Sequence, residues 1–198
     1  MGPLSRLEEK LLAEDIRLDK RALLRLERFA ELLEAWNTTH NLTGARNREA
    51  IESNIVDSLI PTTFVEAPES LLDVGTGAGF PGLLLAIAWP ETETVLCEPL
   101  NKRAAFLRLA VLELELRRVT VAKTRVEQLR HEPFALVSSR AVTDTALLLR
   151  LTEHLADDAT RYLLYKGSRL DEELRDVEAG AEIRIVERPP RRYLLFRR

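Results

Sequence analysis

The twelve residues from Leu71 to Gly82, LLDVGTGAGFPG, contain four glycines directly after a short apolar run. A loop of this kind lets a strand turn tightly into a helix and lets a ligand approach the backbone closely. Two motifs overlap in it. Gly77–Gly82 matches G-x-G-x-x-G, which is typical of dinucleotide sites, and Asp73–Gly79 matches D-x-G-x-G-x-G, which is typical of S-adenosylmethionine sites.

The end of the preceding strand separates these two interpretations. In a dinucleotide site the first glycine of the motif directly follows the strand. The apolar run ends at Val74, so Gly75 is the first glycine, and the sixth position counted from it is Phe80 instead of glycine. The position of the strand therefore favours S-adenosylmethionine.

Two carboxylates agree with that cofactor. Asp73 suits a ligand with a positive sulfonium and an amino group, whereas it would repel a pyrophosphate. Glu98 follows the next apolar run and can accept both ribose hydroxyls, although dinucleotide sites also use an acidic residue there. The other explanation of the loop is a β–α turn that needs glycines only for its geometry.

The elements that must position this loop alternate between strands and helices. Regular alternation predicts a parallel sheet covered on both faces, and the terminal hairpin should add an antiparallel strand at one edge. Strands are predicted at 71–74, 93–97, 119–122, 134–139 and 161–165, helices at 80–89, 101–116, 146–155 and near 170–177, and a hairpin at 182–196.

The first sixty residues have a different pattern. Apolar residues at helical spacing predict helices within residues 4–36, with Asp19 as an N-cap. A polar loop is expected over 37–47, and another helix over 48–59, before Pro61. No linker follows, so we expect a helical cap at 1–60 that belongs to the same single domain as the core at 61–198.

Composition excludes several classes of protein. The chain has one cysteine, Cys97, and begins with no long apolar segment, which argues against a disulfide framework, a signal peptide and a membrane span and favours the cytoplasm. A net charge of −3 argues against avid binding to naked nucleic acid, although six arginines between Arg184 and Arg198 can form a local phosphate-binding patch. His40, His131 and His154 have no metal-ligand spacing, so no metal is expected.

Taken together, these motifs closely resemble the bacterial 16S rRNA guanine-N7 methyltransferases known as RsmG or GidB. The resemblance covers nearly the whole chain and rests on AWNTTHNLTGARN, LLDVGTGAGFPG, NKRAAFLR, VEQL, SSRAV and YKG. The run from the glycine loop straight into Phe80-Pro81-Gly82 is its most specific part. One segment departs from the family pattern R-H-x-x-D-S, because this chain has SNIVDS at 53–58.

The resemblance implies a class I S-adenosylmethionine methyltransferase fold: α/β and Rossmann-like, with a mostly parallel seven-stranded sheet. It implies methyl transfer to N7 of one guanine in the 530 loop of 16S rRNA, with the rRNA or the small ribosomal subunit as partner and the protein acting as a monomer. The resemblance implies cofactor contacts at Gly75, Phe80, Val126, Glu127 and Arg140, and Arg140 is also the expected catalytic residue. The motif and its carboxylates add Asp73, Thr76, Gly77, Gly79 and Glu98 to the expected cofactor-binding residues. Expected RNA contacts are Asn41, Lys166, Arg191 and Arg192, with Lys102-Arg103 as a further phosphate-binding candidate that a solvated charged face explains equally well.

Guanine N7 has a free lone pair, so an in-line displacement needs alignment and no general base. This agrees with the lack of a His–carboxylate pair and leaves Cys97 as a core residue. Residues 37–43 can shape the guanine pocket or simply cap a helix end. Three alternatives stay open: a class I methyltransferase with another acceptor, a non-catalytic ribosome-binding factor, and a nicotinamide-dependent oxidoreductase.

Overall fold

A seven-stranded sheet runs through the computed structural model, which describes residues 4–45, 47–140, 143–167, 170–173, 182–189 and 191–197. The strand order is β3-β2-β1-β4-β5-β7-β6. β1 to β5 are parallel, and β7 is antiparallel to both of its neighbours. The strands are β1 Ser70–Val74, β2 Glu93–Cys97, β3 Val119–Ala122, β4 Leu136–Arg140, β5 Arg161–Lys166, β6 Glu182–Arg188 and β7 Arg191–Arg197.

This topology confirms the predicted mostly parallel sheet with an antiparallel strand from the C-terminal hairpin. One detail of the prediction is wrong. The antiparallel strand β7 lies between β5 and β6, so β6 is the edge strand. The strand order reverses between β1 and β4, and ligands in open α/β sheets bind at such a reversal, beyond the carboxyl ends of the strands.

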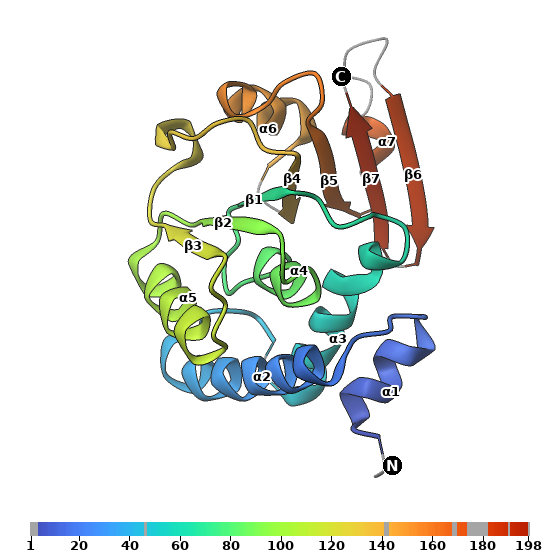
Figure 1. Ribbon diagram of the computed structural model, residues 1–198, viewed down its shortest axis with the longest axis vertical. Helices are drawn as coiled ribbons and strands as arrows, with labels where there is room; N and C mark the ends of the chain where they lie inside the picture. Colours follow the sequence, from blue (N-terminus) through green and yellow to red (C-terminus); the bar gives the residue numbers. More distant parts are fainter. Residues whose placement is uncertain are drawn as a thin grey trace.

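Helices cover both faces of the sheet (Figure 1). One face carries α3, α4 and α5, with α1 and α2 beyond them, and the other carries α6 and α7. The helices are α1 Arg6–Ala13, α2 Lys20–His40, α3 Arg48–Leu59, α4 Gly82–Ala88, α5 Asn101–Glu113, α6 Thr145–Leu151 and α7 Leu170–Glu173, with short 3-10 helices at Ile60–Thr63, Val126–Gln128 and Glu153–Leu155.

The sheet has a hydrophobic cluster on each of its two faces, which explains why the strand sequences are continuous apolar runs. Alternate side chains of a strand point to opposite faces. In β1, Leu71 joins the cluster of the α1–α5 side, whereas Leu72 and Val74 join the cluster of the α6 side. Because both faces are buried, nearly every strand position is apolar, and a charged residue such as Asp73 stands out.

The N-terminal helices share the first cluster with the sheet. Phe29 of α2 packs edge-on against Phe80, with ring centroids 5.5 Å apart, and also contacts Phe106 of α5. Asp19 caps α2 by accepting a hydrogen bond from the backbone N–H of Ala22. The cap helices are therefore packed directly against the glycine loop and the helices behind it.

The predicted end of α2 was wrong. We expected a polar loop from residue 37, but the helix continues through His40 and ends where Asn41 adopts a left-handed conformation with φ of 48°. Asparagine tolerates this conformation and is a common C-terminal cap, and it outweighs the modest helix propensity of the Asn-Thr-Thr-His segment. The helix predicted over 48–59 is confirmed. Of the helix predicted near 170–177, only 170–173 falls within the described residues.

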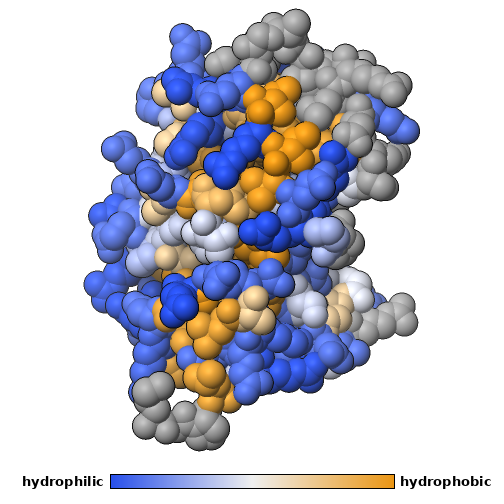
Figure 2. All heavy atoms as spheres, turned by 90° about the vertical axis from the view of Figure 1, so that its right-hand side faces the viewer, coloured by the Kyte–Doolittle hydropathy of each residue, from blue (hydrophilic) through white to orange (hydrophobic). Residues whose placement is uncertain are grey.

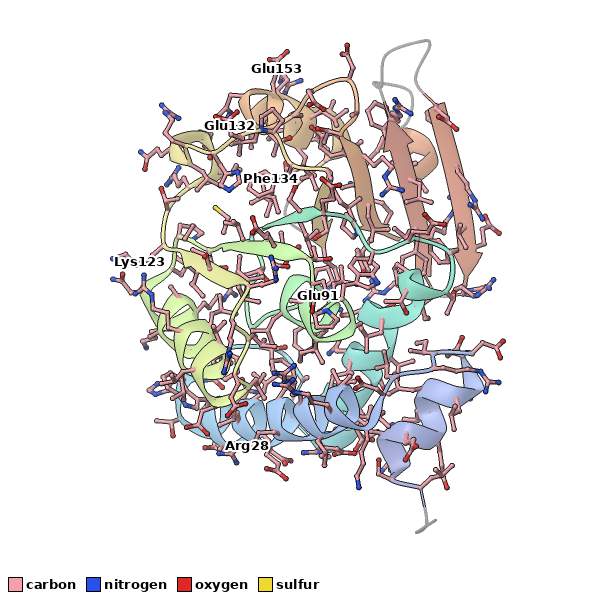
Figure 3. The ribbon with its side chains drawn as sticks, viewed as in Figure 1. Arg28, Glu91, Lys123, Glu132, Phe134 and Glu153 are labelled. Atoms are coloured by element: carbon pink, nitrogen blue, oxygen red, sulfur yellow. The ribbon has the colours of Figure 1, made fainter. Side chains whose placement is uncertain are left out.

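The surface is mostly hydrophilic. Viewed from the side of β6, apolar residues form one area in the upper middle of the face and another lower down, with hydrophilic residues around both (Figure 2). Charged residues on an edge strand discourage pairing with another chain. Arg28 on α2 and Lys123 after β3 point away from the sheet (Figure 3). None of the helices in the described residues combines the length and the hydrophobicity that a membrane span requires.

Candidate active site

A cavity of about 710 Å³ opens at the carboxyl ends of β1, β2 and β4. Its size falls in the usual range for small-molecule sites, and it lies where the strand order reverses. It is lined by Leu42, Thr43, Gly44, Val74, Gly75, Thr76, Gly77, Ala78, Phe80, Cys97, Glu98, Pro99, Leu100, Arg103, Arg125, Val126, Glu127, Arg140 and Leu151.

The glycine loop forms the wall between β1 and α4. Gly75, Gly77 and Gly79 all have positive φ, at 65°, 62° and 100°, a conformation that other residues adopt only with strain. Gly75 and Gly77 line the cavity, whereas Gly79 lies behind it, where an added Cβ would meet Leu83 and Phe29. The loop therefore presents its first two glycines to a ligand and uses the third to pack against the helices.

Glu98, the residue directly after β2, supports the same loop. Its side chain is 2% exposed. Oε2 accepts the N–H of Gly77 at 3.0 Å, and Oε1 accepts the N–H of Leu100 at 2.9 Å. A carboxylate has about four acceptor positions, so both oxygens keep capacity for a diol of the ligand. The sequence did not predict the hydrogen bond from Gly77, because a glutamate after a strand gives no indication of which backbone N–H its carboxylate will accept.

Asp73 does not line the cavity. Its carboxylate is fully buried between β4 and the start of α4, where Ser138 Oγ donates to it at 2.6 Å and the N–H of Gly82 at 2.9 Å. Burial raises the pKa of Asp73 to about 6, although hydrogen bonds from Ser138, Thr76 and Gly82 partly oppose this rise. The side chain thus shapes the loop from behind, and a direct contact of Asp73 with a cofactor has no support in this geometry.

Arg140 ends β4 and reaches the cavity. Its guanidinium carbon lies 4.9 Å from the centroid of the Phe80 ring, so the cation packs over the residue that marks the glycine loop. Nη1 donates to Asn54 Oδ1 at 3.3 Å and to Asp57 Oδ2 at 3.2 Å. Burial lowers the pKa of Arg140 from its usual value, and Asp57 opposes that change. An arginine keeps its charge in proteins.

Asp57 and Asn54 are the residues that sequence reasoning missed. Both lie on α3, in the segment that departs from the family pattern, and both contact Arg140 across 83 and 86 residues of chain. The available signal was the Asp-Ser pair at 57–58, which this segment retains although its first two residues differ from the pattern.

The loop after α2 closes another side of the cavity through Leu42, Thr43 and Gly44. Asn37 holds it: its Nδ2 donates to the carbonyl of Ala45 at 2.8 Å, and its Oδ1 accepts the N–H of Thr43 at 3.0 Å. Asn41, expected to contact RNA, is exposed and caps the helix. Residues 37–43 therefore both end a helix and wall the cavity.

Val126 and Glu127 line the cavity from the turn after β3. Val126 is buried and Glu127 exposed, which offers an apolar wall beside a polar rim. Arg103 also lines the cavity, with Nη1 at 3.9 Å from Glu98 Oε2, whereas Lys102 is exposed and outside it.

The predicted RNA-binding residues on β5 and β7 are engaged within the protein. Lys166 is 9% exposed, and its Nζ donates to Glu173 at 2.6 Å. Although partial burial favours a higher value, hydrogen bonds from Lys166 and Thr145 lower the pKa of Glu173. Arg191 Nε donates to both oxygens of Asp57, at 3.1 and 3.0 Å, and Arg192 pairs with Glu187 at 3.3 Å. A phosphate would compete with these partners.

The residues present fit S-adenosylmethionine. Paired carboxylate acceptors at Glu98, free backbone space at Gly77 and an apolar wall at Val126 suit a ribose diol and an adenine ring. The glycine loop does not have to bind a pyrophosphate. The carboxylate of Asp73 is packed directly behind this loop, and its negative charge would repel one. Glu98, Val126 and the loop glycines would hold the cofactor at this edge of the sheet.

Comparisons of the sequence with known proteins agree with this site. The family model GidB, rRNA small subunit methyltransferase G, matches residues 22–188. The chain belongs to the rRNA small subunit methyltransferase G family. It is 44% identical to the family member of Wolinella succinogenes, with 96% of this chain and 97% of that protein covered. It is 41% identical to the member of Aliarcobacter butzleri, with 96% and 98% covered.

Solved structures identify the fold of this methyltransferase G family member. The precorrin-6y C5,15-methyltransferase of Geobacter metallireducens matches with a TM-score of 0.53 at 12% identity, over 81% of this chain and 91% of that one. A mutant of MtNAS in complex with S-adenosylmethionine matches with a TM-score of 0.58 at 15% identity, over 90% of this chain and 72% of that one. The chain therefore has the class I S-adenosylmethionine methyltransferase fold that the sequence predicted.

Proposed function

We propose that this protein transfers a methyl group from S-adenosylmethionine to N7 of one guanine in the 530 loop of 16S rRNA. The observation that carries the proposal is the convergence of the glycine loop, Glu98 and Arg140 on one cavity in a member of this family. The relatives from Wolinella succinogenes and Aliarcobacter butzleri are named ribosomal RNA small subunit methyltransferase G, which supports rRNA of the small subunit as the substrate.

The charged groups at the cavity suit a displacement that needs no general base. When bound, S-adenosylmethionine supplies an activated methyl group on its sulfonium. Guanine N7 attacks with its own lone pair, so the protein has to align the base and tune the local charge. Arg140 provides a fixed cation beside the cavity, and no histidine is among the described residues that line it.

Because the protein has a net charge of −3, binding of RNA requires a local surface with basic residues. Arg103 and Arg125 lie at the cavity itself, and Lys102, Lys123 and Arg130 are exposed on nearby segments. Such contacts to phosphates position a nucleic acid without reading its sequence. We propose that this side docks the rRNA, in the cytoplasm and with the protein acting as a monomer, and that an assembled small subunit presents the guanine.

The test incubates purified protein and labelled S-adenosylmethionine with small subunits, and separately with free 16S rRNA, from cells that lack the protein. Nucleoside mass analysis should find 7-methylguanosine at one position of the 530 loop. Cofactor binding without that product would contradict the proposal. A product elsewhere would indicate another acceptor, subunit binding without transfer would indicate a non-catalytic factor, and NADH binding in place of S-adenosylmethionine would indicate an oxidoreductase.

A further inference from the structure

Three elements that are distant in the sequence meet at the carboxylate of Asp57. Arg140 Nη1 donates to Oδ2 at 3.2 Å, Arg191 Nε to Oδ2 at 3.0 Å, and Tyr193 OH to Oδ1 at 3.1 Å. The side chain of Asp57 is only 14% exposed. One carboxylate of the helical cap thus joins the catalytic edge of β4 to the C-terminal strand β7.

The negative charge of Asp57 compensates the positive charges of Arg140 and Arg191. Arg140 and Arg191 approach the same carboxylate, and each cation raises the energy of the other. Removing an anion that two partly buried cations share leaves their repulsion uncompensated. Without Asp57, we expect the guanidinium of Arg140 to turn away from Arg191 and from its present plane.

The guanidinium of Arg140 is held from two directions. Its central carbon lies over the ring of Phe80, 4.9 Å from the ring centroid, and Asn54 and Asp57 on α3 accept hydrogen bonds from Nη1. A guanidinium held by a ring and by two acceptors has little rotational freedom left. In the described residues, both side-chain hydrogen bonds of Arg140 use Nη1, which leaves its other donors for the cavity that it lines.

The helix that carries Asp57 is itself pinned at this point. Tyr165 OH of β5 donates to the carbonyl of Ser58 at 2.6 Å, and Tyr193 OH of β7 shares its one hydrogen between Asp57 Oδ1 and the carbonyl of Asp57, which lies 2.9 Å away. The two tyrosine rings pack edge to face, with centroids 5.2 Å apart. The position of Asp57 is therefore set by hydrogen bonds from β5 and β7 of the sheet.

We infer that Asp57 is a positioning residue: it holds the guanidinium of Arg140 in the orientation that binds S-adenosylmethionine and aligns the acceptor base, and so couples the seating of the helical cap to the active site. Asn54 supports the same nitrogen with a neutral acceptor. The alignment of the acceptor base rests on the proposed function, whereas the effect of Asp57 on cofactor binding requires only that the protein binds S-adenosylmethionine.

The test is a double-mutant cycle on the full chain with Asp57→Asn, Arg140→Ala and the double variant, measured by calorimetric titration with S-adenosylmethionine. We expect each single variant to bind about tenfold more weakly, the scale of one lost charged hydrogen bond. If Asp57 acts through Arg140, the double variant should bind no more weakly than Arg140→Ala. Effects that multiply would overturn the inference.

A matched control separates positioning from general stability. Glu52 lies on the same helix, its side chain is 5% exposed, and it pairs with Lys10 and Arg48 on the side away from the cavity. Glu52→Gln should lower the melting temperature and leave cofactor affinity within about twofold of wild type, since it touches no part of the cavity. If Glu52→Gln weakened binding as much as Asp57→Asn at equal loss of stability, the effect would be structural and the inference would fail.

Transfer kinetics then test the catalytic part. With small subunits as substrate, Asp57→Asn should lower kcat as well as raise KM for S-adenosylmethionine, and Asp57→Glu should recover part of kcat. A wild-type protein that binds the cofactor but methylates no guanine would contradict the proposed function, while the binding cycle would still decide the positioning role. If Asp57→Asn changed KM and left kcat unchanged, the proposed role of Asp57 in aligning the acceptor base would be contradicted.

Discussion

The backbone N–H of Gly82 donates to Asp73 Oδ2 at 2.9 Å, and a Cβ atom at position 82 would overlap with the Cβ and carboxylate of Asp73. The two residues are therefore a matched pair: a buried carboxylate at the end of β1 and a glycine at the start of α4. This pairing explains the last glycine of the loop, which the S-adenosylmethionine motif does not include.

Gly82→Ala should destabilise the protein, because the added methyl group must displace a fully buried side chain. Overpacking of this kind costs about 1–3 kcal/mol, and any movement of Asp73 also weakens its hydrogen bonds. Urea denaturation would measure the change. Gly44→Ala is the control, since no atom of the described residues lies within 4 Å of a Cβ there. Equal stability of the two variants would contradict the pairing.

Asp73 should make stability depend on pH. Burial raises the pKa of Asp73 to about 6 in the folded protein, above the value of about 3.9 for an unfolded chain. The folded state therefore holds the proton more tightly, and the contribution of Asp73 to stability should fall as pH rises between about 4 and 6 and level off above that. The total change attributable to Asp73 is on the order of 3 kcal/mol.

The measurement compares urea denaturation of wild type and Asp73→Asn at several pH values. Other titrating groups cancel in the difference, and the hydrogen bond altered by asparagine adds an offset that does not vary with pH. The stability of wild type relative to the variant should decline through this window. A constant difference would contradict the raised pKa.

Glu98→Gln should weaken binding of S-adenosylmethionine by about 10- to 100-fold, the effect of losing charged hydrogen bonds. The amide places an NH₂ group where one oxygen now accepts from Gly77 or Leu100, so it disturbs the loop as well as the ligand. Calorimetric titration would measure it. Glu93→Gln, at the start of the strand that precedes Glu98, is the control, because that carboxylate is 71% exposed. Similar losses in both variants would count against the assigned role.

Asn37→Ala should loosen the loop that walls the cavity, because the side-chain amide of Asn37 bonds to this loop through both its nitrogen and its oxygen. Hydrogen exchange at the N–H of Thr43 should become faster, and cofactor affinity should fall by about threefold to tenfold. Thr38→Ala is the control, because within the described part of the chain its hydroxyl contacts the carbonyl of Ala35 and the hydroxyl of Thr39, both in the same helix. Unchanged exchange at Thr43 would show that Asn37 does not hold the loop.

Local features of this chain follow from the sequence alone. Glycines with positive φ at 75, 77 and 79, the N-cap at Asp19 and the apolar strand runs depend on neighbouring residues and on burial, so their patterns predict the loop, the helix starts and the order of strands and helices. The glycine spacing also indicates which cofactor the loop suits. The end of α2 was missed because Asn41 stops a helix by a backbone conformation that composition does not reveal.

The tertiary structure alone decided which side chains meet. Asp73 turns away from the cavity because the alternation of β1 points it toward Gly82 and Ser138. Arg140 and Asp57, 83 residues apart, come together only because the cap helix α3 packs against the reversal point of the sheet. Such contacts depend on how elements pack across the whole chain, and no spacing within the sequence encodes the distance between two atoms so far apart.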